Sequence, residues 1–435
     1  MKKTEVLLVQ GQRIVYGFFS VIFFAFSFFF LSSCKDDVTT PSTTSGIQYP
    51  FYSEDYSLPQ TQGPQQLSDY LTGPHTDYHQ YGWNICASLV DSTNATLAFF
   101  IAIEYNASEK EPYRGGVGFG KTEEDGYKWS GFTNTSVQTT SNPWSVTLTT
   151  PLFPGSFITI QLASGLMGSS NAVYKLTADV YDFNGKNLKV DVRLRDQFGA
   201  MNQGYGTTSF YPHYLTSVQR NSIMALPEKT IGAYLTASGD RMSFQGAYYY
   251  ALPLMDVEQF NIEYDGSAIH GSSGKSWMDY FVKSYNEESL VMQKGAKWNW
   301  IAIQLPEINS AINVLDISST VSGPLPYARL FNMNSERTKN GARKAVHSWG
   351  VDEITVEPFG EEWVTSTGQK YSMQYRVRLQ SSTMPGDFTV TMLRKNQAVV
   401  LPEGSNYQGL GIVDGVLGGK AVHGQCWVEV QPVGL

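Results

Sequence analysis

Two segments alternate apolar and polar side chains without a break, and this pattern limits the possible folds more than any other feature. In residues 187–196, Leu188, Val190, Val192 and Leu194 alternate with charged residues, and residues 371–380 repeat the design with larger apolar side chains. A period of two predicts a strand with one packed and one solvated face, as in antiparallel sheets and barrels. The chain is therefore expected to be built from β-strands.

The rest of the chain fits the same interpretation. Aromatic residues make up 14% and charged residues 16% of the chain, and 40 glycines are present, a mixture that suits strands and tight turns. Asn184-Gly185 and Asp414-Gly415 are turn signals. The sequence predicts an all-β protein of barrels or sandwiches. Further strands are expected at 98–105, 157–162, 175–181, 298–305, 388–393 and 424–430.

The N-terminus has the form of a bacterial lipoprotein signal. Lys2, Lys3 and Arg13 precede an apolar run, which closes with Leu-Ser-Ser before Cys34. This predicts a signal peptide over 1–33, a lipid on Cys34 and a flexible Thr- and Ser-rich tether within 34–50. The following Lys-Asp-Asp is similar to an export signal for the outer face of the outer membrane. A plain membrane helix is the alternative, but the apolar run is short for a span.

The charge and the motifs of the sequence limit which binding partners and cofactors are expected. The formal net charge is −8 and the basic residues are scattered, so no nucleic-acid surface is expected. The sequence contains no Gly-x-Ser-x-Gly elbow or phosphate loop. His75 and His79 are spaced like a metal pair, but no third ligand is nearby. No metal or organic cofactor is expected. The expected partners are a hydrophobic small molecule and, through the lipid on Cys34, a membrane.

Two cysteines remain after Cys34. A disulfide between Cys86 and Cys426 is permitted in an oxidising compartment, but two cysteines define no framework. Two buried free thiols are the simpler interpretation.

A set of ordered motifs carries a resemblance to a known family. Gly274-Lys-Ser-Trp277-Met-Asp279 is followed by Trp298-Asn-Trp300, which leads an alternating strand ending in Gln-Leu. These elements resemble the tandem lipocalin-like family of carotenoid 1,2-hydratases and AttH proteins. The resemblance extends to further segments: Tyr248-Tyr249-Tyr250-Ala251-Leu252-Pro253, Trp363 with Thr365-Ser366-Thr367-Gly368 and Tyr371, Tyr407-Gln408-Gly409, and His423-Gly424-Gln425-Cys426-Trp427-Val428-Glu429.

The N-terminal half departs from the family pattern. Gly82-Trp83-Asn84 is similar in order to the family's Glu-Trp-Trp-Tyr stretch, but Tyr81 stands where that glutamate would be. The resemblance nevertheless implies two lipocalin-like barrels in tandem, expected here over 51–255 and 256–435. It also implies action on hydrophobic, often isoprenoid, molecules by hydratases or, more distantly, cyclases.

Asp279 matches the position to which the resemblance assigns acid catalysis. On a strand, Trp277 and Asp279 share one face. If that face points into a barrel, rings surround the carboxyl group and Trp298 and Trp300 offer their faces to a cation. A structural carboxylate and aromatic barrel filling are the alternatives. Tyr248, Tyr250 and His270 are the other expected substrate-binding residues, the two tyrosines because they share a side of a strand.

Three functions therefore stay open. The first is a cofactor-free hydratase, isomerase or cyclase for a lipophilic unsaturated substrate, with Asp279 as general acid. The second is a carrier that binds a hydrophobic ligand without chemistry. The third is a surface lipoprotein that captures glycans with exposed aromatic side chains.

Overall fold

The protein was analysed as a computed structural model, which describes residues 80–107, 112–121, 126–132, 135–182, 184–203, 210–211, 246–284, 297–319, 323–324, 326–338, 341–349, 353–401 and 404–431. Within these ranges the chain is almost entirely β, as predicted, with one turn of 3-10 helix, η2 (Pro306–Ile308). No helix there is long and apolar enough to cross a membrane. The predicted signal peptide, Cys34, the tether, His75 and His79 lie outside the described residues.

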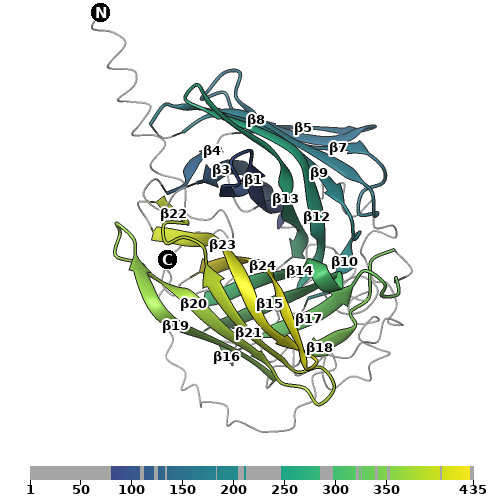
Figure 1. Cartoon of the computed structure of the whole chain (residues 1–435). Helices are drawn as coiled ribbons and strands as arrows, with labels where there is room; N and C mark the ends of the chain where they lie inside the picture. The colour runs from purple at the N-terminus through teal and green to yellow at the C-terminus, as the bar shows by residue number, and fades with distance from the viewer. Residues whose placement is uncertain are drawn as a thin grey trace, which may run out of the picture.

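The strands form two curled antiparallel sheets in tandem, which matches the predicted fold class (Figure 1). The first sheet has the order β4-β3-β2-β1-β13-β12-β9-β8-β7-β6-β5, with β10 and β11 paired to β12. Its strands are β1 (Gln80–Asp91), β2 (Thr96–Asn106), β3 (Tyr113–Gly120), β4 (Lys128–Phe132), β5 (Ser136–Ser141), β6 (Trp144–Thr149), β7 (Phe157–Ser164), β8 (Val173–Tyr181), β9 (Asn187–Asp196), β10 (Met201–Asn202), β11 (Phe210–Tyr211), β12 (Gly246–Tyr264) and β13 (Ser267–Ser284).

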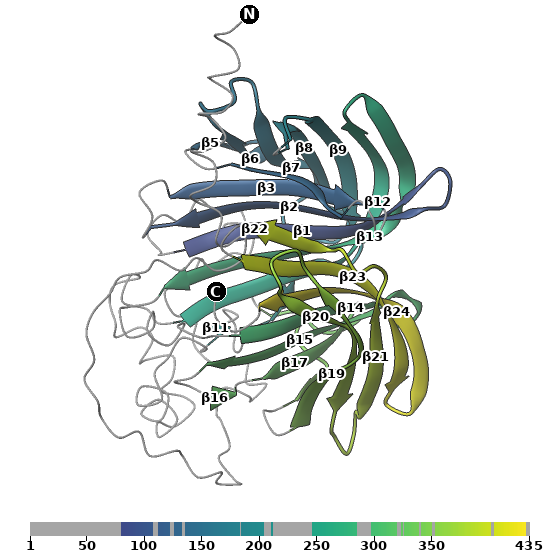
Figure 2. The ribbon, with the colours of Figure 1, turned by 90° about the vertical axis from the view of Figure 1, so that its left-hand side faces the viewer.

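The second sheet has the order β18-β17-β15-β14-β24-β23-β21-β20-β19, with β16 paired to β15 and β22 to β23. Figure 2 shows its curvature from the side, next to the first sheet. Its strands are β14 (Lys297–Leu305), β15 (Ser310–Ser319), β16 (Gly323–Pro324), β17 (Tyr327–Asn332), β18 (His347–Trp349), β19 (Ile354–Val364), β20 (Lys370–Leu379), β21 (Gly386–Met392), β22 (Ala398–Leu401), β23 (Gly404–Leu417) and β24 (Lys420–Gln431).

The alternating segments behave as their pattern predicts. In β9 and β20 the apolar positions are buried, while the polar positions between them are mostly exposed or half-buried. The turn predicted at Asp414-Gly415 is wrong, because β23 continues through both residues. The chain turns instead at Gly418 and Gly419, whose φ angles of 57° and 79° are both positive. A two-residue hairpin turn of this kind needs positive φ twice, which two glycines supply without strain.

The change of sheet comes later than the expected domain boundary at 255/256. Strand β12 runs through that point, and β13 pairs with both β12 and β1. The first strand of the second sheet, β14, begins at Lys297. The β12–β13 hairpin is thus inserted between β1 and β9, so that β13 lies in the middle of the first sheet.

Three hydrophobic cores result from this arrangement. One consists mainly of buried side chains of the first sheet, and a second consists of buried side chains of the second sheet. A third, which we call the junction cluster, combines side chains from both sheets and holds them together. Its buried members are Cys86, Ala98, Phe100, Tyr127, Trp129, Phe198, Met201, Ala251, Leu254 and Trp277 from the first sheet and its connections, and Trp298, Trp300, Ala302, Ala311, Phe331, Val399, Leu410 and Trp427 from the second.

Polar side chains reinforce the same junction. Gln304 of β14 donates from Nε2 to the Ser276 carbonyl at 2.9 Å and to the Pro253 carbonyl at 2.5 Å. Its Oε1 accepts from Gln425 at 2.5 Å, and Gln425 accepts from Ser88 at 2.8 Å. This chain of amides joins the central strands of the two sheets.

Candidate functional site

Asp279 lies near the centre of the first sheet, on β13 between β1 and β12. Its side chain is buried, with the residue 7% exposed. Oδ1 accepts hydrogen bonds from Trp277 Nε1 at 2.6 Å and Gln203 Nε2 at 2.9 Å. Oδ2 accepts one from the Tyr249 hydroxyl at 2.5 Å. Three donors converge on a single buried carboxyl group, so two effects oppose each other: burial favours its protonated form and the hydrogen bonds favour its ionised form.

Strand alternation decides which way this carboxyl points. Met278 and Tyr280 belong to the core of the first sheet, whereas Trp277 belongs to the junction cluster. Asp279 shares the face of Trp277, as the sequence predicted, because side chains two residues apart lie on the same side of a strand. This face lies away from the core of the first sheet and meets the second sheet.

The tyrosine at this site is Tyr249, which the sequence analysis missed. Tyr250 is buried in the core of the first sheet, on the opposite face of β12 from Tyr249. The side chain of Tyr248 lies outside the described residues, and only its strand pairings with Val282 and Phe210 are seen. Burial, and then the neighbouring Asp279, raise the pKa of Tyr249 well above its usual value, so the hydroxyl keeps its proton.

The second sheet supplies the other two predicted tryptophans. The rings of Trp300 and Trp277 meet edge to face with centroids 5.9 Å apart. Trp298 Nε1 donates to Glu429 Oε1 at 2.8 Å. The structure therefore brings Trp277, Trp298, Trp300 and Asp279 to one place, at the meeting of the two sheets.

Glu429 is a second buried carboxyl group that the sequence analysis did not single out. It lies on β24 opposite Trp300 in the register and is 4% exposed. Burial raises the pKa of Glu429 to about 8, against the neighbouring amide of Gln408 and the hydrogen bond from Trp298, which lower it. Glu429 is thus mainly protonated at neutral pH. Its signal in the sequence was a lone acid in the otherwise apolar run Cys426 to Val430.

His270 does not belong to this site. It is exposed and pairs with Asn261 near the beginning of β13. Nine residues of extended strand separate it from Asp279, which is roughly 30 Å along the chain. A strand this long moves its ends far apart, so His270 does not lie beside Asp279.

Both cysteines are buried free thiols, so the simpler interpretation holds. Cys86 lies in the junction cluster and donates to the Trp277 carbonyl at 3.7 Å, whereas Cys426 lies in the core of the second sheet. Burial, then the charges of Asp279 and Glu429, raise the pKa of Cys86 well above its usual value. An unreactive thiol results.

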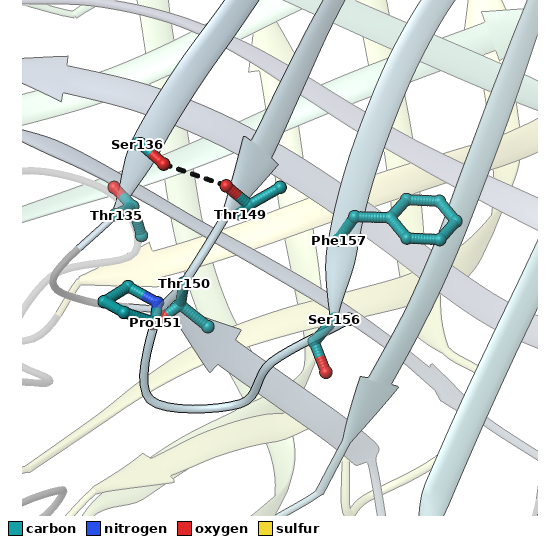
Figure 3. A pocket seen from close by; sticks show the side chains of 8 residues that line it. Thr135, Ser136, Thr149, Thr150, Pro151, Ser156 and Phe157 are labelled. Atoms are coloured by element: carbon teal, nitrogen blue, oxygen red, sulfur yellow. Dashed lines mark hydrogen bonds between the residues drawn. The ribbon is translucent and has the colours of Figure 1, made fainter.

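A pocket of about 500 Å³ lies elsewhere, at the ends of β5 to β7 (Figure 3). Most of its lining residues are serines and threonines, and the hydroxyl groups of Ser136 and Thr149 are 2.9 Å apart. It shares no residue with the Asp279 site. Within the described residues, no group of three or more His, Cys, Asp or Glu side chains is placed to hold a metal ion.

Solved structures share this fold. A putative AttH protein (NE1406) from Nitrosomonas europaea matches with a TM-score of 0.56 and 16% identity, over 85% of this chain and 97% of its own. Kievitone hydratase from Nectria haematococca matches with a TM-score of 0.56 and 14% identity, over 88% and 98%. CghA matches with a TM-score of 0.51 and 12% identity, over 88% and 97%.

These likenesses confirm the tandem lipocalin-like fold that the sequence resemblance implied. At such identities they describe the fold and leave the chemistry to the site. No protein-family model and no curated protein matches the chain.

Proposed function

We propose that this protein is a cofactor-free enzyme that adds a proton to a carbon–carbon double bond of a lipophilic, isoprenoid-like molecule. The reaction is a hydration, or an isomerisation or cyclisation that begins in the same way. The observation that carries the proposal is the carboxyl group of Asp279, which is buried beside Trp277 and hydrogen-bonded to Trp277, Gln203 and Tyr249.

The surroundings suit a carbocation intermediate. The rings of Trp277 and Trp300 are within contact distance of each other, and a cation over such a face gains about 0.5–2 kcal/mol. In its protonated form Asp279 is the general acid, either directly or through the Tyr249 hydroxyl that its Oδ2 contacts. The three donors then hold the carboxylate left after proton transfer, which lowers the cost of ionising a buried acid.

Proteins with the same fold support the class of reaction. One of them is named as a hydratase of kievitone, and CghA has been solved together with Sch210972. A hydrophobic carrier remains the second candidate, because the rings of the junction cluster would bind an apolar ligand without help from Asp279.

The proposal includes a place in the cell. A lipid on Cys34 and the tether after it would hold the folded part at the bacterial outer membrane, facing outwards. Replacing Cys34 by Ser should move the protein from the membrane fraction to the soluble fraction after cell disruption. Protease added to intact cells should degrade the wild-type protein if it faces outwards and spare it if it faces the periplasm.

The activity test uses residues 35–435 made without the lipid and incubated in heavy water with bacterial and plant lipid extracts. Mass spectrometry compares the wild type with Asp279→Asn, and Asp414→Asn, at an exposed site on the β23–β24 hairpin, is the control. A product that gains water or carbon-bound deuterium in the wild type and the control, but not in D279N, supports the enzyme. A compound retained unchanged by all three forms supports the carrier. If nothing is converted or retained, glycans become the next candidates.

A further inference from the structure

Glu429 and Asp279 are brought together from opposite sheets. Trp300 pairs with Glu429 along β14 and β24, and its ring contacts that of Trp277, which in turn donates to Asp279. Burial is the main cause of the raised pKa of Glu429, and the charges of Glu104 and then Asp279 add to it. After burial, the charges of Asp279 and Glu429 also raise the pKa of Cys86. The two acids are therefore close enough to influence each other's ionisation.

Groups from six other strands face Glu429. On the first sheet these are Cys86 of β1, Glu104 of β2 and Tyr249 of β12, and Arg114 of β3 forms an ion pair with Glu104 at 2.8 Å. On the second sheet they are the neutral side chains of Trp298 of β14 and Gln408 of β23. Arg114 is the cation of this set and is paired with Glu104, yet Glu104 still raises the pKa of Glu429, ahead of Asp279. Asp279 and Glu429 are the two acids of this set whose side chains accept from the indoles of the junction cluster.

A buried donor lies at the same place. Nε1 of Trp300 is buried and has no hydrogen-bond partner among the described residues. The residue is 7% exposed and lies between the strand of Glu429 and the ring of Trp277. A buried indole N–H normally finds a partner, so this one is a binding position for an oxygen atom of a ligand or water.

We propose that Asp279 and Glu429 act as one pair that holds a single proton at neutral pH, and that Trp300 Nε1–H binds the oxygen of the water that is added. The catalytic part of this inference rests on the proposed function. Two carboxyl groups that interact are harder to ionise together than singly, and their protons then leave in steps that belong to the pair.

The pair supplies both proton transfers of a hydration. Its protonated member gives the proton to one carbon of the double bond, and the π electrons form the new carbon–hydrogen bond. Water held by Trp300 attacks the other carbon, which carries the positive charge. The ionised member takes a proton from that water. One water is added in total, and the pair again holds one proton, which returns to the first carboxyl through solvent.

The test follows indole N–H signals by NMR over a pH titration of the folded protein, without any substrate. Trp298 reports on Glu429 and Trp277 reports on Asp279, because each indole donates to that carboxyl. Signals are assigned with Trp298→Phe and Trp277→Phe. In the wild type we expect the Trp298 signal to move as the pH passes from neutral to alkaline, and the Trp277 signal to follow in the same step.

Two variants test whether Asp279 and Glu429 titrate together. In Glu429→Gln the alkaline step of the Trp277 signal should disappear. In Asp279→Asn the Trp298 step should shift to lower pH by about one unit or more, since a like charge has been removed. The control Asp414→Asn should leave both signals unchanged. A Trp277 signal that ignores E429Q, or a Trp298 step that stays in place in D279N, overturns the pair; if E429Q does not fold, the D279N titration decides alone.

Measurements of substrate conversion then distinguish the proposed reaction from the proposed carboxyl pair. If the pair is seen by NMR but no substrate is converted, the proposed reaction fails and the pair stands. If D279N abolishes conversion while E429Q converts at the wild-type rate, the reaction stands and the role of Glu429 is overturned. For a working pair, E429Q should lose about 10²-fold or more in rate. Trp300→Phe should lose water addition while still exchanging deuterium into the substrate.

Discussion

The hydroxyl of Tyr249 donates to Oδ2 of Asp279 at 2.5 Å, across the neighbouring strands β12 and β13. In the register Asp279 stands opposite Ala251, so Tyr249 reaches it along the diagonal, on the face that meets the second sheet. Diagonal neighbours on one face of a sheet are within reach of long aromatic side chains. The contact therefore depends on the register of this hairpin.

Removing this hydroxyl should impair the reaction and leave the fold intact. We expect Tyr249→Phe to lower the rate by about 10²-fold, the lower end of the usual contribution of acid–base catalysis. Tyr250→Phe is the matched control, since Tyr250 lies on the opposite face in the core of the first sheet. Initial rates with the substrate found in the heavy-water screen measure both. Equal rates for the two variants would contradict a role for Tyr249.

Glu429 should make the protein less stable as the pH rises. Burial raises its pKa from 4.5 to about 8, so the folded state holds a proton that the unfolded state releases above pH 4.5. The free energy of unfolding should fall between these pH values, by on the order of a few kcal/mol, and level off above them. Glu429→Gln should flatten this slope in urea unfolding experiments.

Buried Asp196, whose pKa is raised to about 7 by burial, adds a slope of the same sign, so E429Q should reduce the slope without removing it. Parallel stability curves for the wild type and E429Q would show that Glu429 ionises equally easily in both states.

The hydrogen bonds of Gln304 should stabilise the packing of the two sheets against each other. Gln304→Leu would leave the Ser276 and Pro253 carbonyls without this donor, at a cost of about 1–3 kcal/mol for each buried group. Gln138→Leu, at an exposed position of β5, should change stability by less than about 0.5 kcal/mol. Urea unfolding measures both. A loss for Q304L no larger than that for Q138L would mean that other contacts hold the sheets together.

Gly274 allows β13 to approach β1 closely. A Cβ at this position would lie 2.0 Å from the Ser88 carbonyl oxygen, and φ is +140°. Gly266 also has a positive φ, +81°, but open space around it. Both Ala variants suffer backbone strain, and G274A alone suffers the overlap, so it should be less stable than G266A by about 1–3 kcal/mol. Thermal unfolding of both would show equal losses if the strands can separate at no cost.

The strands were predictable because their signal is local. Alternation in residues 187–196 and 371–380 identified β9 and β20 and their buried faces, since every second side chain lies on the same side of any strand. The same rule placed Trp277 with Asp279. Ordered motifs also implied the tandem lipocalin-like fold, which the solved structures share.

The site itself depended on contacts between distant parts of the chain. Alternation separates Tyr249 from Tyr250 but does not say which of them faces Asp279. That depends on the register of β12 against β13 and on the insertion of this hairpin between β1 and β9. Long-range pairing also decided where the chain passes from the first sheet to the second, because β12 pairs with β9 and β13 with β1, and both partners lie much earlier in the sequence.

Sequence alone therefore determined the strands and their two faces, because a strand's periodicity is a property of consecutive residues. The family resemblance, and not the periodicity, singled out Asp279 as the candidate acid. Only the tertiary structure decided that the face of Asp279 meets the second sheet and that Glu429, near the end of β24, comes to lie close to it. Packing of one sheet on another follows from the sum of many long-range contacts, and no short segment carries that information.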